Sequence, residues 1–191
     1  GKTCTSLAIG CALGARVAVI DSERGSASKY AKLFTFDVDG LGDDFGPQRY
    51  VDKIHEAERA GYDVLVIDSL SHAWMGRGGA LELVDNAARK SQSNNTYTAW
   101  RNVTPLHNAL VDAILQSKLH IIATMRTKTE YVMERDERTG KTAPKRVGLA
   151  PVQRQDMEYE FDVVGEMDLE NSLIISKSRC PMISGAVVQK P

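Results

Sequence analysis

Gly1-Lys2-Thr3 opens the chain, and a helical pattern over residues 5–13 follows it at once. The tripeptide matches the end of the phosphate-binding motif G-x-x-x-x-G-K-[ST], in which the loop after a buried strand leads into a helix. Neither such a strand nor the first glycine of the motif stands ahead of Gly1 in this sequence. We therefore expect a fragment that begins inside its own phosphate-binding loop. The tripeptide alone also fits a helix that happens to start with Lys-Thr, so the motifs downstream decide between the two.

The composition is that of an ordinary globular protein. The chain has 191 residues, 42% apolar and 26% charged residues, and a net charge of -1, which predicts a single domain over residues 1–191. This charge gives no overall attraction to nucleic acid, so any such contact must come from a local patch. No apolar run approaches the roughly 20 residues that span a bilayer. The three cysteines have no metal or disulfide spacing, so we expect a reduced, cytoplasmic protein without a membrane partner.

Apolar strands alternate with helical patterns in the first two-thirds of the chain. Strands are predicted at residues 16–20, 62–67 and 119–123, and helices at 26–34, 47–60, 80–90 and 98–117, the last disturbed near Pro105. This alternation favours an α/β fold with a mostly parallel sheet flanked by helices. Residues 127–146 are polar and predict a hairpin with its turn at 136–141. Strand patterns at 161–167 and 172–176 then predict a C-terminal β extension.

Polar residues follow each predicted strand, at the edge where open α/β sheets bind ligands. Asp68 stands where a carboxylate holds Mg²⁺, and Glu23 stands where one can accept a proton from an attacking water. Thr124 is placed to sense a terminal phosphate, while Lys2 would reach the outer phosphates and Thr3 would ligate Mg²⁺. These features predict ATP and Mg²⁺ as cofactors. The plainer alternatives are a turn cap for Asp68 and an exposed ion pair between Glu23 and Arg24.

Three runs resemble the consecutive core strands of RecA-type ATPases: Val17-Ala18-Val19-Ile20-Asp21-Ser22-Glu23, Asp63-Val64-Leu65-Val66-Ile67-Asp68-Ser69 and Ile121-Ile122-Ala123-Thr124. The sequence is most similar to the phage RecA-like "AAA domain" nucleotide-binding proteins, some of which act in single-strand annealing and recombination. Residues 20–27, 123–128, 148–154 and 159–162 carry the likeness further, so that it covers nearly the whole chain. The resemblance implies a RecA-like P-loop NTPase core.

The resemblance also implies roles for individual residues. Gly1, Lys2, Thr3 and Thr124 would bind nucleotide, Thr3 and Asp68 would hold Mg²⁺, and Glu23 would be the catalytic glutamate. Lys177 and Arg179 resemble the basic pair that RecA proteins insert into the neighbouring subunit's nucleotide site, which implies a homo-oligomer with active sites completed in trans. The alternative is solvated charge on an edge strand. One departure from the RecA pattern is Thr124-Met125, where RecA has Asn-Gln.

In RecA-like proteins, the loops after the second and third of these strands contact single-stranded DNA. Residues 71–79 and 127–146 occupy those positions, and the second segment carries six basic and four acidic residues. Aromatic and cationic side chains in flexible loops suit an unpaired strand, although a solvated hairpin explains the second segment equally well. The DNA-binding candidates in the two segments are Trp74, Arg77, Lys128, Arg138, Lys141, Lys145 and Arg146.

Three functional hypotheses follow. The first is a Mg²⁺-dependent ATPase coupled to single-stranded DNA in phage recombination or replication. The second is an ATPase motor or loader that acts on a protein partner, such as a helicase or packaging component. The third is a nucleotide-gated binding module with little turnover.

Overall fold

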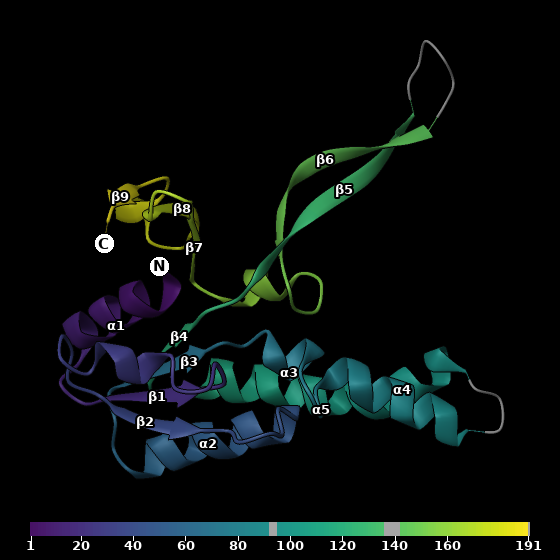
Figure 1. The fold of residues 1–191 in the computed structure, drawn as a ribbon, viewed down its shortest axis with the longest axis horizontal. Coiled ribbons are helices and arrows are strands. Elements are labelled where there is room, and N and C mark those ends of the chain that lie inside the picture. The colour runs from purple at the N-terminus through teal and green to yellow at the C-terminus, as the bar shows by residue number, and fades with distance from the viewer. Residues whose placement is uncertain (92–94, 136–141, 191) are drawn as a thin grey trace.

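The computed structural model of this protein describes residues 1–91, 95–135 and 142–190 (Figure 1). Its α-helices are α1 (Lys2–Leu13), α2 (Pro47–Arg59), α3 (His72–Met75), α4 (Ala80–Lys90) and α5 (Thr96–Gln116). Its strands are β1 (Val17–Asp21), β2 (Asp37–Gly40), β3 (Val64–Asp68), β4 (His120–Ala123), β5 (Thr127–Arg135), β6 (Thr142–Pro151), β7 (Val163–Met167), β8 (Ser172–Ser178) and β9 (Val187–Gln189). Three short 3₁₀ helices complete the list: η1 (Ala27–Tyr30), η2 (Met157–Glu160) and η3 (Pro181–Ile183).

A parallel sheet forms the centre of the molecule, with the strand order β2-β1-β3-β4. The three strands predicted from apolar runs are β1, β3 and β4. β2 was missed because its sequence, Asp-Val-Asp-Gly, is polar and fully exposed at the sheet edge. Asp21 pairs with Asp68 in the register of β1 and β3, and Ile67 pairs with Ala123 between β3 and β4. The carboxyl ends of these three strands therefore meet at one edge.

Helices cover both faces of this sheet, which confirms the α/β class predicted from the sequence (Figure 1). Along β3, Val64 and Val66 face α1, while Leu65 and Ile67 face α2 and α5. All four side chains are at most 1% exposed, and burying one such side chain stabilises the fold by about 1.5–3 kcal/mol. A strand covered on both faces reads as a continuous apolar run, and this is why β3 was recognisable in the sequence.

A second layer of packing lies beyond the sheet, where α4 and α5 pair along their apolar sides. Trp74 of α3 stacks on Trp100 of α5, with ring centroids 5.5 Å apart. The helix α5 runs without interruption through Pro105, so the predicted disturbance is wrong. The segment at 71–79, expected as a loop, contains α3, whose Ala73 is fully buried.

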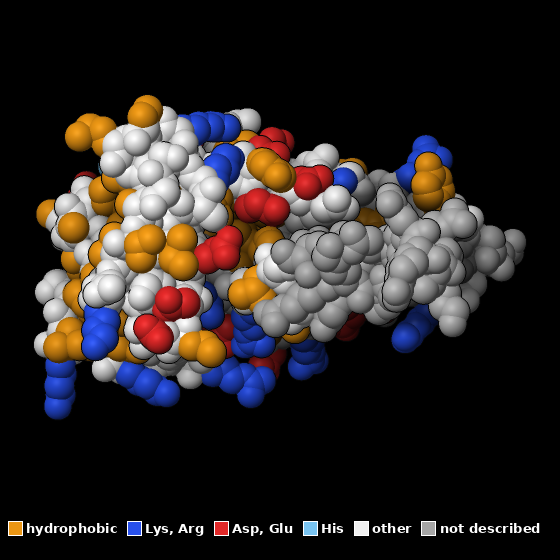
Figure 2. Space-filling view, turned by 90° about the horizontal axis from the view of Figure 1, so that it is seen from above, with side chains coloured by type: hydrophobic (Ala, Val, Ile, Leu, Met, Phe, Trp, Pro, Cys, Tyr) orange, Lys and Arg blue, Asp and Glu red, His pale blue; other side chains and the backbone are white. Residues whose placement is uncertain are grey.

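Two antiparallel units follow the central sheet. The strands β5 and β6 pair over their whole described length and project away from the sheet as an arm, with a register irregularity between Glu130 and Tyr131 (Figure 1). The strands β7, β8 and β9 form a small sheet close to the N-terminus, which confirms the C-terminal β extension. Apolar side chains stand exposed on and around this sheet, including Leu169, Met182 and Val187 (Figure 2). Among the described residues, no helix is long and apolar enough to cross a membrane.

Candidate nucleotide site

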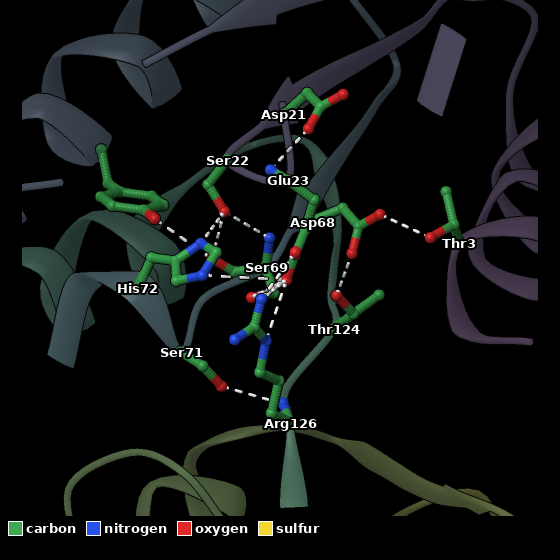
Figure 3. Close-up of polar contacts among 11 residues, drawn as sticks. Thr3, Asp21, Ser22, Glu23, Asp68, Ser69, Ser71, His72, Thr124 and Arg126 are labelled. Carbon is green, nitrogen blue, oxygen red and sulfur yellow. Dashed lines mark hydrogen bonds and ion pairs between the residues drawn. The ribbon is translucent and has the colours of Figure 1, made fainter. Parts of the chain in front are cut away.

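Asp68, the last residue of β3, lies at the centre of a hydrogen-bonded group that joins three segments of the chain (Figure 3). The Thr3 hydroxyl donates to Asp68 Oδ2 at 2.7 Å, and the Thr124 hydroxyl donates to Asp68 Oδ1 at 2.5 Å. Asp68 is 3% exposed and Thr124 is 6% exposed. A buried carboxylate needs such partners because desolvation is otherwise costly. The structure thus brings together three residues that the sequence analysis selected separately.

Thr3 and Asp68 border a cavity of about 260 Å³ at the N-terminal end of α1, whereas Thr124, which was expected to bind nucleotide, is not part of the lining of that cavity. Its lining includes the three residues of the motif fragment, Gly1, Lys2 and Thr3, together with Glu23, Ser26, Tyr30, Asp68 and Arg126. Lys2 is exposed, so its ammonium is accessible to a ligand in this cavity. Backbone N–H groups at a helix N-terminus favour an anion. The geometry therefore suits a phosphate beside a carboxylate that two hydroxyls support.

The segment after β1 is shaped by Asp21, a buried residue that the sequence analysis did not select. Its carboxylate accepts the backbone N–H groups of Glu23 at 2.7 Å and Ala27 at 3.2 Å. Between these points Arg24 and Gly25 adopt positive φ values of 54° and 86°, a conformation that glycine tolerates readily. Asp21 thereby turns the chain so that Glu23 borders the cavity (Figure 3).

Glu23 is held by Arg126 rather than by the neighbouring Arg24. Arg126 Nη2 lies 2.9 Å from Glu23 Oε1 and 2.7 Å from Oε2, and Arg126 Nε lies 3.1 Å from Oε1. The Ser69 hydroxyl donates to Oε1 at 3.3 Å, and His72 Nε2 lies 3.9 Å from the same oxygen. Partial burial acts to raise the pKa of Glu23, but the hydrogen bonds and positive charge of Arg126 outweigh it and lower that pKa.

A buried network fixes the chain on either side of this pair. Ser22 Oγ donates to the Ser69 carbonyl at 3.0 Å, accepts the Ser69 N–H at 2.7 Å and lies 2.7 Å from His72 Nδ1. The Tyr50 hydroxyl donates to the same Ser69 carbonyl at 3.1 Å. Burial lowers the pKa of His72, with Glu23 opposing this effect. This network ties the residue before Glu23 to the residue after Asp68. No sequence pattern indicated it, because its members come from three separate segments.

The two cations expected to act in trans lie on β8 and just after it, and both have partners within the chain. Lys177 Nζ donates to the carbonyls of Tyr159 at 2.5 Å and Phe161 at 2.7 Å. Arg179 pairs with Asp162 at 2.8 Å, and its side chain is 65% exposed. Neither residue lines the cavity of its own chain. Their trans role stays a prediction.

The DNA-binding candidates are distributed over two regions. Trp74 stacks on Trp100 and meets the edge of His107, so part of its ring packs within the protein. Arg77 and Lys128 are exposed. Lys145 and Arg146 belong to β6, but their side chains lie outside the part of the chain that the structure describes, and Arg138 and Lys141 lie outside the described residues altogether.

The oxygen donors at this site fit Mg²⁺. Thr3 and Asp68 supply a hydroxyl and a carboxylate, which are the hard oxygen ligands that Mg²⁺ prefers, and one or two carboxylates suffice where substrate phosphates supply further ligands. Lys2 and Arg126 supply positive charge on the same cavity. The described residues contain no group of three or more His, Cys, Asp and Glu side chains suited to a metal. The chain therefore fits a phosphate-bound Mg²⁺ better than a metal held by protein alone.

Comparison with known families agrees with this geometry. A family described as "AAA domain" matches residues 1–184. The chain belongs to this AAA domain family, and it is a P-loop ATPase-like domain of the nucleotide-binding kind. No curated protein and no solved structure matches the chain.

Proposed function

We propose that this protein is a Mg²⁺-dependent ATPase that works on single-stranded DNA in phage recombination or replication. The observation that supports it most is that Thr3, Asp68 and Glu23 line one cavity at the carboxyl ends of β1 and β3, with Thr124 at the end of β4 hydrogen-bonded to Asp68. Ligands of open α/β sheets bind at this edge. A carboxylate that holds a metal and a second that accepts a proton are the two acids that ATP hydrolysis requires.

Each residue has a distinct task in this proposal. Lys2 and the N–H groups at the start of α1 bind the phosphates, while Thr3 and Asp68 hold Mg²⁺. Bound Mg²⁺ supplies positive charge that polarises the phosphate oxygens. Glu23 orients the attacking water and accepts its proton. Thr124 keeps Asp68 in position through its hydrogen bond to Oδ1.

Single-stranded DNA is the partner we favour, because the arm of β5 and β6 begins directly after β4 and this site. The exposed cations Arg77 and Lys128 lie nine residues after the end of β3 and five residues after the end of β4. Neutralising phosphates with such side chains gives affinity that falls as salt rises. A protein partner that docks on the projecting arm is the second candidate, favoured by the length of the arm (Figure 1).

We further propose that the active protein is a homo-oligomer in which Arg179 completes the site of a neighbouring subunit. Its side chain is 65% exposed and lies away from the cavity of its own chain. A cation supplied in trans stabilises the negative charge of the transition state, which raises the rate by roughly 10³- to 10⁵-fold. Mixing Arg179→Ala protein with Glu23→Gln protein tests this point. Recovery of turnover in the mixture supports a site shared between subunits, and inactivity at every ratio contradicts it.

The test of the whole proposal is ATP turnover with and without single-stranded DNA. Residues 1–3 supply only the end of the phosphate-binding motif, so the protein assayed should carry a complete G-x-x-x-x-G-K-T loop. We expect turnover that DNA stimulates and that Lys2→Ala abolishes. Turnover that DNA does not change favours a protein partner instead. Binding of ATP with no turnover under either condition favours a nucleotide-gated module.

A further inference from the structure

We propose that Arg126 is a two-position switch, which holds Glu23 while the site lacks a γ-phosphate and moves to the γ-phosphate when ATP binds. Its movement releases Glu23 to act as the base and alters the base of the β5–β6 arm. This inference rests on the proposed ATP site and adds a residue that discriminates ATP from ADP and carries that difference to the arm.

The contact between the two side chains occupies the base that hydrolysis needs. Arg126 contacts both carboxylate oxygens of Glu23 within 2.9 Å through Nη2, and Nε adds a contact to Oε1 at 3.1 Å (Figure 3). Bidentate, charge-assisted hydrogen bonds of this kind are among the strongest in proteins. The same contacts lower the pKa of Glu23, against the effect of partial burial. A carboxylate held in this way has little capacity to accept a proton from water.

Arg126 is also placed to leave Glu23 for a phosphate. It lines the same cavity as Lys2 and Thr3, and its side chain is 43% exposed. Because the side chain is only partly buried where it pairs with Glu23, its departure does not leave a buried charge without a partner. A terminal phosphate offers the planar guanidinium a bidentate partner with more negative charge than one carboxylate. ATP offers this γ-phosphate and ADP does not. Only ATP therefore favours the conformation in which Arg126 has left Glu23. A ligand shifts a conformational equilibrium only through such a difference.

The backbone of Arg126 connects this exchange to the arm. Its carbonyl accepts the Val152 N–H at 2.7 Å, which closes the arm between the start of β5 and the end of β6. Its own N–H donates to Ser71 Oγ at 2.9 Å. Gln153, which follows Val152 after the end of β6, is buried, and its side chain donates to the Leu70 carbonyl at 3.0 Å. Both strands of the arm are thus fixed to the segment that follows Asp68, so a shift of Arg126 reaches the arm through direct contacts.

Equilibrium binding tests the switch without relying on turnover. The protein with a complete phosphate-binding loop is titrated with Mg²⁺ and a non-hydrolysable ATP analogue, and separately with ADP. We expect Arg126→Ala to weaken binding of the analogue by roughly 10- to 100-fold, the range for charge-assisted hydrogen bonds, and to leave ADP binding unchanged. Glu23→Ala should tighten binding of the analogue, because it removes the competing partner. Arg126→Lys, which keeps the charge without the planar fork, should fall between.

Two further measurements separate the switch from a merely structural ion pair. Arg154 also lies at the base of the arm, but it donates to Asn108 and is not part of the cavity lining, so Arg154→Ala is the matched control and should not change the ratio of ATP to ADP affinity. Hydrogen exchange of the β5 and β6 backbone should differ between the analogue and ADP in the wild-type protein, and this difference should vanish in Arg126→Ala. If the wild-type protein binds the analogue but neither Arg126 variant changes the ratio of analogue to ADP affinity, that result overturns the switch and leaves the proposed function standing. Failure of the folded wild-type protein to bind any nucleotide overturns the proposed function as well.

Discussion

Replacing Thr124 with valine removes one hydrogen bond at the centre of the site and keeps the shape of the side chain. Thr124 is 6% exposed and Asp68 is 3% exposed, so water cannot readily replace the lost hydroxyl. A hydrogen bond to a charged group contributes about 1.5–3 kcal/mol. We therefore expect Thr124→Val to lower the free energy of unfolding by about this amount. For a chain of this size the melting temperature should fall by about 2–4 °C for each kcal/mol.

Chemical denaturation of four proteins measures this interaction directly: the wild type, Thr124→Val, Asp68→Ala and the double variant. In the Asp68→Ala background the valine should cost much less, so that the cycle yields a coupling of about 1.5–3 kcal/mol. Thr127→Val, at an exposed position of β5, is the matched control and should change the free energy of unfolding by less than about 0.5 kcal/mol. A coupling below about 0.5 kcal/mol between Thr124 and Asp68 would refute this account of the site.

The remaining predictions concern the core and the pH dependence of stability. Leu65 is 1% exposed, and Leu65→Ala should lower the free energy of unfolding in denaturant by about 2–5 kcal/mol. Leu115 is 51% exposed, and Leu115→Ala should lower it by less than about 0.5 kcal/mol. Equal losses in the two variants would contradict the assigned packing. The pKa of Glu23 is lowered in the folded protein, so its carboxylate stabilises the fold above the ordinary glutamate pKa of about 4.3, and this contribution is lost as the pH falls through the lowered value. The free energy of unfolding, measured above and below this pH window, should fall less at low pH in Arg126→Ala than in the wild type. An identical fall in the two proteins would argue against the ion pair.

The sequence indicated Thr3, Asp68 and Thr124 for a physical reason. Each follows or opens an element with a strong local pattern, and parallel strands bring their carboxyl ends to one edge. The predicted meeting of these residues depended only on that topology. The same reasoning identified β3, because a strand covered on both faces is apolar throughout.

Other features depend on contacts that no local pattern reveals. Arg126 was within a run singled out for Thr124, but its partner Glu23 lies 103 residues away in the chain. The conformation of the segment after β1 depends on Asp21, whose role is set by the backbone N–H groups that its buried side chain accepts. Trp74 was expected to face DNA, and its stacking on Trp100 required knowledge of how α3 meets α5. The edge strand β2 has a single apolar residue, Val38, and all four of its residues are exposed, so it lacked the apolar run that marked the other strands.

The most direct test of the central claim is a comparison of wild-type protein and Glu23→Gln, both with a complete phosphate-binding loop, in single-turnover ATP hydrolysis with ATP affinity measured in parallel. The account predicts that the variant still binds ATP and that its rate falls by about 10²- to 10⁴-fold, the usual contribution of a positioned general base. Equal rates in the two proteins would contradict the claim that Glu23 serves as the base of an ATPase built on the Thr3–Asp68–Thr124 group.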